Sequence, residues 1–182
     1  MKPRLTEYDC GITCIDTMYV CAGHAACYLL EVNGRTAFID TGTGHSVPYL
    51  LETLRLKNLS IEDVDYVIPT HVHLDHAGGA GILMSKLPNA KLVIHPRGAA
   101  HMINPKKLIA GATAVYGEEK FYEMFGNILP INEDRVLIAE DCCEIDLNGR
   151  TLKFIDTPGH ARHHFCVYDK SSSSFFTGDT FG

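Results

Sequence analysis

The feature that most constrains this chain is a six-residue segment, HVHLDH, which follows a short apolar stretch at 65–69. It holds four side chains that bind metals, those of His71, His73, Asp75 and His76. If the apolar stretch is a buried strand, its extended end places His71 and His73 on one side of the backbone. Asp75 and His76 then follow at a bend and face a second point. Because buried imidazoles and carboxylates need partners, the spacing indicates two neighbouring cations rather than packing.

Two more candidate ligands follow other predicted strands. His160 lies in the segment DTPGH, after the apolar stretch 152–155, and Asp179 lies in the segment FFTGDT. Three strand ends therefore deliver ligands to what the sequence predicts to be one edge of a sandwich. Imidazole and carboxylate ligands favour zinc, iron or manganese over calcium. We therefore predict a site for one of these three metals.

Apolar periodicity and turn residues predict a β-rich first third, a mixed α/β middle and a β-rich final third. Asn-Gly pairs at 33–34 and 148–149 predict tight hairpins. Helices are expected from Pro48, over 80–87, and over 98–125 with breaks near Pro105 and Gly111. The expected strands are 14–20, 25–32, 35–40, 65–69, 91–95, 135–139, 143–147, 150–156, 165–168 and 175–177. Two packed sheets flanked by helices fit this order better than one parallel sheet.

Composition and charge argue against several other classes of protein. Hydrophobic residues make up 46% of the chain, enough for a proper core, and the formal net charge of −6 argues against a nucleic-acid-binding surface. No segment has the basic region and apolar run of a secretory signal, or the roughly 20 apolar residues of a membrane helix. We therefore expect a cytoplasmic protein that binds neither nucleic acid nor membrane. Its seven cysteines include no C-x-x-C pair and are expected to be reduced thiols.

With Gly78 and Gly79 after it, HVHLDH resembles the H-x-H-x-D-H signature of the metallo-β-lactamase-fold superfamily. The resemblance runs from the loop around Asp40 to Asp179, which is nearly the whole chain, and glyoxalase II-like metallo-hydrolases are the leading group. It implies an α/β fold, the αββα four-layer sandwich, with metals at one edge of the two packed sheets.

Carried over position by position, the resemblance implies two divalent metal ions, with zinc favoured over iron or manganese. The implied ligands are His71, His73 and His160 for the first metal, Asp75 and His76 for the second, and Asp179 as a bridge. The resemblance also implies that Asp40 supports the ligand loop without binding metal, and His164 is expected to play a similar part.

One part of the superfamily pattern is absent from this sequence. A final His downstream of Asp179 is expected on the second metal, but the sequence ends at Gly182. We therefore expect residues 1–182 to be a metallo-β-lactamase-like domain that lacks its C-terminal part. The second metal position is expected to be weak in this chain.

A divalent metal lowers the pKa of bound water from 15.7 to about 7, so hydroxide is available at neutral pH. The sequence therefore predicts a metallo-hydrolase acting on an ester, thioester or lactone of a small molecule. Asp75 would orient the nucleophile or accept its proton.

Two alternatives to this hydrolase stay open. One is a mononuclear-iron oxidoreductase resembling persulfide dioxygenases, through His71, His160 and Asp179, and the other is a non-catalytic, metal-stabilised domain. The substrate, the metal and the oligomeric state are also left open.

Overall fold

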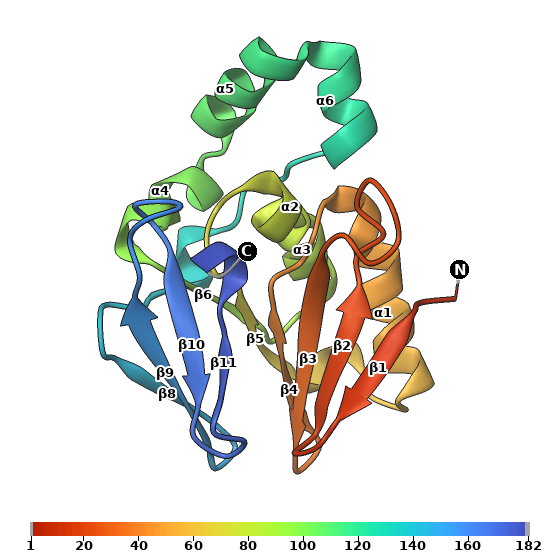
Figure 1. Cartoon of the computed structure of the whole chain (residues 1–182), viewed down its shortest axis with the longest axis vertical. Helices are drawn as coiled ribbons and strands as arrows, with labels where there is room; N and C mark the ends of the chain where they lie inside the picture. The colour runs from red at the N-terminus through yellow and green to blue at the C-terminus, as the bar shows by residue number, and fades with distance from the viewer. Residues whose placement is uncertain (1, 181–182) are drawn as a thin grey trace.

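The computed structural model describes residues 2–180, which form two β-sheets packed face to face (Figure 1). In the larger sheet seven strands stand in chain order from β1 to β7, and the smaller sheet has the order β11-β10-β9-β8. The strands are β1 (Leu5–Tyr8), β2 (Ile12–Asp16), β3 (Ala26–Val32), β4 (Arg35–Ile39), β5 (Val64–Ile68), β6 (Lys91–Ile94), β7 (Val136–Ile138), β8 (Glu144–Leu147), β9 (Arg150–Asp156), β10 (Phe165–Asp169) and β11 (Ser174–Phe176).

Residues 2–180 form six α-helices, and the first four pack against the outer face of the seven-stranded sheet. The six helices are α1 (Val47–Leu56), α2 (Leu74–Ala77), α3 (Ala80–Lys86), α4 (Pro96–Ile103), α5 (Lys106–Tyr116) and α6 (Glu118–Phe125). Leu50 of α1, Leu83 of α3 and Met102 of α4 share one core with Phe38 and Leu92 of the sheet. α5 and α6 form a hairpin that stands beyond the ends of the strands (Figure 1). Within residues 2–180, no helix is long and apolar enough to cross a membrane.

A second core lies between the two sheets. Phe154 and Val167 of the small sheet meet Ile39 and Ile68 of the large sheet there. Successive residues of a central strand serve both cores, since Phe38 faces the helices and Ile39 faces the small sheet. A strand buried on both faces needs a near-continuous apolar run, which is why these strands could be located in the sequence.

The chain directions bring several loops to one edge of the sandwich. β4, β5, β6 and β7 are parallel, so their carboxyl ends lie at the same edge of the large sheet. Asp40 follows β4 there, and the loop 69–73 follows β5. The loop 157–164 of the small sheet joins them, because the Phe165 N–H at its end donates to the Thr70 carbonyl over 3.0 Å. The edge therefore gathers residues that are far apart in the sequence.

The expected α/β architecture, two packed sheets with helices, is confirmed. No helix among residues 2–180 packs on the outer face of the four-stranded sheet, where the Phe175 side chain is 53% exposed. The described residues therefore supply three of the four layers that the resemblance implies.

Two expectations about local structure are wrong. The strand expected over 14–20 ends at Asp16, because Met18 and Val20 have left-handed φ angles of 56° and 59°. The helix break expected near Gly111 lies at Gly117 instead, where φ is 81°. Gly111 has open space around it and continues α5, so a glycine in the sequence did not by itself mark a helix end.

Candidate metal centre

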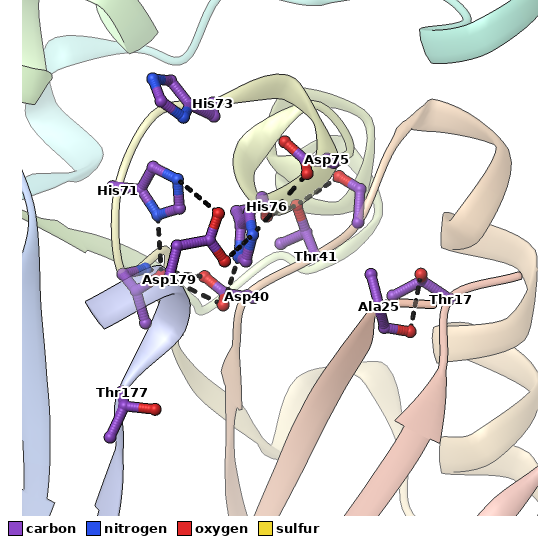
Figure 2. A network of polar contacts seen from close by, with 12 residues as sticks. Thr17, Ala25, Asp40, Thr41, His71, His73, Asp75, His76, Thr177 and Asp179 are labelled. Atoms are coloured by element: carbon purple, nitrogen blue, oxygen red, sulfur yellow. Dashed lines mark hydrogen bonds and ion pairs between the residues drawn. The ribbon is translucent and has the colours of Figure 1, made fainter. Parts of the chain in front are cut away.

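The HVHLDH segment is the turn that joins β5 to α2. Thr70 and His71 are completely buried, and the backbone is extended at His73, where ψ is 147°, before α2 begins at Leu74. The first two histidines therefore lie before the helix and His76 lies within it. Figure 2 shows the His71 ring close to the His76 ring and to the Asp179 carboxylate. The predicted cluster thus faces the edge of the sandwich described above.

Three imidazoles form the first group of candidate ligands. One nitrogen from each of His71, His73 and His160 lies within 4.8 Å of the other two. His160 Nε2 and His73 Nδ1 are 2.8 Å apart. His71 Nε2 has no hydrogen-bond partner, although it is buried, and among the described residues no other buried side-chain nitrogen or oxygen shares this condition. An unpartnered nitrogen that faces two other imidazole nitrogens fits a divalent cation.

The second group combines His71, His76 and Asp179, whose ligand atoms also lie within 4.8 Å of one another. Asp179 stands between the two groups. Its Oδ1 is 3.0 Å from His76 Nε2 (Figure 2). Its Oδ2 is 3.2 Å from His160 Nε2. The carboxylate therefore offers one oxygen to each group, as a bridging ligand would.

Asp40 supports the ligand loop through its contacts with Thr70 and His76. Its Oδ2 lies 2.8 Å from His76 Nδ1, and its Oδ1 accepts the Thr70 backbone N–H over 2.7 Å. The Thr70 hydroxyl is 3.0 Å from the same Oδ1 and 3.1 Å from His71 Nδ1. If this hydroxyl donates to Asp40 and accepts from His71 Nδ1–H, both His71 and His76 carry their proton on Nδ1. The Nε2 lone pairs of both rings then point at the site.

Two of the other predicted residues lie at the border of the site. The Asp75 carboxylate is 3.8 Å from His76 Nε2 and belongs to neither three-ligand group. His164 is completely buried, its Nε2 accepts the Asp179 backbone N–H over 3.3 Å, and its Nδ1 is 2.8 Å from Thr157 Oγ1. His164 therefore holds the short 3-10 turn Gly178–Thr180 that carries Asp179.

The sequence did not identify two residues that shape the site. Thr70 links Asp40 to His71, and its position between the strand and the first ligand was the signal that could have revealed it. His163 accepts the Val72 backbone N–H at Nδ1 over 3.3 Å and packs 5.7 Å, between ring centroids, from His73. Only its place shortly after His160 in the sequence pointed to it.

Charge is distributed unevenly over the two groups. Burial, together with the neighbouring imidazoles of His76 and His73, holds the pKa of His71 far below its usual range. Burial also lowers the pKa of His76, but Asp40, Asp75 and Asp179 outweigh it and raise the pKa of His76 to about 9. In the absence of metal, a proton on His76 therefore supplies the positive charge that a cation would bring to these carboxylates.

Clefts border the site on two sides. One, of about 290 Å³, is lined by Asp75, His76 and Asp179, and another, of about 540 Å³, is lined by His73 and Asp75. A further cleft, of about 790 Å³ beside α6, contains none of the predicted ligands. The clefts of about 290 and 540 Å³ therefore open onto the candidate ligands.

Comparisons with known proteins identify relatives of this chain. The metallo-beta-lactamase fold-containing protein ST1585 of Sulfurisphaera tokodaii is 30% identical over 162 residues, which are 87% of this chain and 57% of that protein. The probable metallo-hydrolase MJ0888 of Methanocaldococcus jannaschii is 26% identical over 158 residues, 87% of this chain and 68% of that protein. The chain therefore spans roughly half to two thirds of the length of these relatives.

Solved structures share the architecture. The crystal structure of ST1585 from Sulfolobus tokodaii superposes with a TM-score of 0.67 at 30% identity, covering 85% of this chain and 57% of that one. The MIM-2 metallo-beta-lactamase superposes with a TM-score of 0.68 at 23% identity, covering 91% of this chain and 56% of that one, and shows the common fold alone.

A family profile covers most of the chain. The profile of the metallo-beta-lactamase superfamily matches residues 22–182, a range that includes all the candidate ligands and the supporting Asp40. Divalent metal binding is implied by this fold and agrees with the histidine cluster. The chain belongs to the metallo-beta-lactamase superfamily.

Proposed function

We propose that this protein is a metal-dependent hydrolase that uses water to cleave an ester, thioester or lactone of a small molecule. The observation that carries the proposal is the buried, unpartnered Nε2 of His71, which belongs to both three-ligand groups. Leaving such an atom without a partner costs about 1–3 kcal/mol. A cation that binds it removes this cost, so the site is built for a cation.

The geometry supports two zinc positions as the working arrangement. His71, His73 and His160 would hold one cation, and His76 with Asp75 would hold the other. Asp179 would bridge them, since each of its oxygens faces a different group. Zinc is favoured because it accepts imidazole and carboxylate in four-coordinate sites that keep a position open for water.

The positions of the side chains suggest how the hydrolysis would proceed. A bound divalent cation supplies Lewis acidity, which lowers the pKa of a water molecule and polarises a substrate carbonyl. Asp75, at the border of the site, orients the attacking water and accepts its proton on a carboxylate oxygen. The water oxygen forms a bond to the carbonyl carbon, and the C–O or C–S bond to the leaving group breaks. The proton held by Asp75 leaves on the alcohol or thiol.

The experiment is a substrate panel with the purified, zinc-loaded protein. Thioesters, esters and lactones should be turned over, and β-lactams and phosphodiesters should be poorer substrates. His71→Ala should abolish turnover, whereas Asp9→Asn, on the exposed turn between β1 and β2, should leave it unchanged. Absence of turnover of every class by protein with its metal fully bound would overturn the proposal.

One alternative function has an observation in its favour. Asp179 Oδ2 lies 3.2 Å from His160 Nε2 and 3.9 Å from His71 Nε2, so these three residues could also hold a single iron. A mononuclear-iron persulfide dioxygenase would use such a set. Oxygen consumption by iron-loaded protein with a low-molecular-weight persulfide, and none with zinc-loaded protein, would favour this alternative over hydrolysis.

A further inference from the structure

A cleft of about 540 Å³ separates α5 from the turn that carries the candidate ligands. His73 and Asp75 stand at one end of this cleft, and Leu108, Ala112 and Tyr116 of α5 line its opposite wall. The volume falls within the range of small-molecule sites, roughly 300–1,000 Å³. The cleft therefore opens onto the metal centre and is large enough for part of a substrate.

Regularly spaced apolar side chains of α5 line this wall, with Lys107 beside them at the start of the helix. Leu108, Ala112 and Tyr116 recur every four residues, so they lie along one side of the helix. None of the residues of this eleven-residue helix is fully buried, although Leu108 and Ala112 are partly covered by the cluster around Phe121 and Phe125. The helix thus presents an apolar stripe that the protein's own core covers only in part.

Aromatic rings form part of the cleft wall. Phe125 at the end of α6 stacks with Tyr19 at 6.0 Å between ring centroids and meets Tyr116 edge-on at 5.6 Å. Tyr19 comes from the loop between β2 and β3, which ends β2 with left-handed residues on either side of it. The β2–β3 loop, α5 and α6 therefore together build a wall of rings next to the ligand turn.

We propose that this cleft binds an apolar acyl chain, so that the protein prefers esters and thioesters of medium-length carboxylic acids. The inference rests on the proposed function, because it concerns the substrate of the same site. A carbonyl carbon held beside His73 and Asp75 directs its acyl substituent along the cleft toward Tyr116 and Phe125. Each methylene that leaves water for such a wall should raise kcat/KM about threefold.

Gly111 offers a way to block the cleft without disturbing the ligands. It lies on the cleft wall, and a Cβ added there has no heavy atom within 4 Å. Gly111→Phe therefore adds a ring to the cleft wall from a Cβ that meets no neighbour. It keeps α5 helical, because phenylalanine forms helix better than glycine. Ala114→Phe is the matched control, since Ala114 is exposed on the same helix and does not line this cleft.

The test uses zinc-loaded wild type, Gly111→Phe and Ala114→Phe with straight-chain thioesters of two to ten carbons. In the wild type and in Ala114→Phe, kcat/KM should rise about threefold per methylene up to roughly eight carbons. Gly111→Phe should lose about 30-fold on the octanoyl thioester and stay within about threefold on the acetyl thioester. A flat chain-length profile in the wild type, or equal losses on both thioesters in Gly111→Phe, would overturn the inference.

Failure of the proposed function can be distinguished from failure of the acyl-chain proposal, because binding to the cleft can be tested without turnover. If the zinc-loaded wild type hydrolyses no thioester, ester or lactone, the proposed hydrolysis is refuted, and calorimetric titration with octanoate and acetate then tests whether the cleft binds an acyl chain. Octanoate binding about 700-fold tighter than acetate, with this preference reduced about 30-fold in Gly111→Phe and kept in Ala114→Phe, would support an acyl site. Equal affinity for the two acids in the wild type would refute it.

Discussion

Asp40 is the residue on which the orientation of both ligand groups depends. It accepts hydrogen bonds from the Thr70 backbone and hydroxyl, and it holds His76 at Nδ1. Its φ of 58° is left-handed, a conformation that Asp tolerates better than most residues. Removing a partner that orients metal ligands typically costs 10–100-fold in affinity.

Asp40→Asn should therefore weaken zinc binding by about 10–100-fold while the protein stays folded. The amide keeps the size of the side chain but has one accepting oxygen where the carboxylate has two. The proton on His76 Nδ1 therefore loses its partner. Competition with a chromophoric chelator measures the affinity, and Asp9→Asn serves as the control. Equal zinc affinity in Asp40→Asn and the control would show that Asp40 does not orient these ligands.

The metal-free protein should be most stable near pH 6.5. The folded pKa of His76 is raised to about 9, so its contribution is complete below its unfolded value of about 6.5 and is lost as the pH rises through 9. Burial lowers the pKa of His71, so the unfolded chain gains its proton first and stability falls as the pH drops below about 6.5. The alkaline loss should be on the order of 2–3 kcal/mol.

Urea denaturation in the presence of chelator between pH 5 and pH 9 measures this profile. His76→Gln should be less stable than the wild type at pH 6.5, and its stability should change little from there to pH 9. A wild-type protein that gains stability steadily over the same interval would contradict the assignment of His76 as the charged imidazole.

At the scale of elements, one buried ion pair ties the small sheet to the large one. Arg150 at the start of β9 donates to Asp169 at the end of β10, with Nε–Oδ1 and Nη2–Oδ2 distances of 3.1 and 2.6 Å. Its Nη1 also donates to the Cys10 carbonyl in the turn between β1 and β2, over 2.7 Å. Arg150 is 2% exposed and Asp169 is completely buried. One guanidinium therefore connects both sheets at the edge away from the ligands.

Arg150→Ala should destabilise the protein by about 3–5 kcal/mol, because it leaves the Asp169 carboxylate buried without a partner. Lys170→Ala is the matched control, since Lys170 pairs with Glu144 on the exposed surface and such pairs contribute about 0–1 kcal/mol. Urea denaturation measures both variants. Zinc affinity of the folded fraction should stay unchanged in each, and a loss of less than 1 kcal/mol in Arg150→Ala would contradict the role given to the pair.

The sequence predicted elements well where burial imposes a pattern. The apolar stretch at 65–69 became the central strand β5, and the stretch at 150–156 became β9, whose alternating burial reflects a strand with one face in the core. It failed where backbone conformation decides the boundary. The residue types of Met18 and Val20 do not predict left-handed φ angles, so only the structure could locate the loop that they belong to. The short edge strand β1 was also missed, since three of its four residues are exposed.

For the site, sequence spacing located the candidate ligands but not their pairing. The HVHLDH segment placed His71 with His73, yet only the fold shows that His71 also faces His76 and Asp179. Asp75 was expected beside His76 on the second metal, and it lies at the border, 3.8 Å from His76 Nε2. These relations depend on how α2 begins, which the spacing of residues along the chain does not fix.

At the scale of the whole molecule, the candidate ligands come from both sheets. His71, His73 and His76 follow β5 of the large sheet, whereas His160 and Asp179 follow β9 and β11 of the small sheet. A cation bound among them would link the two sheets at the edge opposite the Arg150 pair. Metal binding is therefore expected to stabilise the packing of one sheet on the other, as well as the ligand loop.

Zinc at about 100 times its dissociation constant should stabilise the fold by about 2.7 kcal/mol. For a domain of this size that corresponds to a rise in Tm of about 5–10 °C relative to protein in chelator. Differential scanning fluorimetry measures the shift. Asp179→Asn should remove most of it, because this variant weakens the bridge between the sheets, and an equal shift in wild type and Asp179→Asn would contradict the bridging role.

Zinc-edge anomalous scattering from a crystal grown with zinc locates the cation directly. Two peaks are predicted at the edge of the sandwich. One should lie about 2.0–2.1 Å from nitrogens of His71, His73 and His160, and the other at a similar distance from His76 with an Asp179 oxygen between the peaks. Zinc present in the crystal but absent from the space between these residues would contradict the conclusion that the histidine cluster is a metal centre.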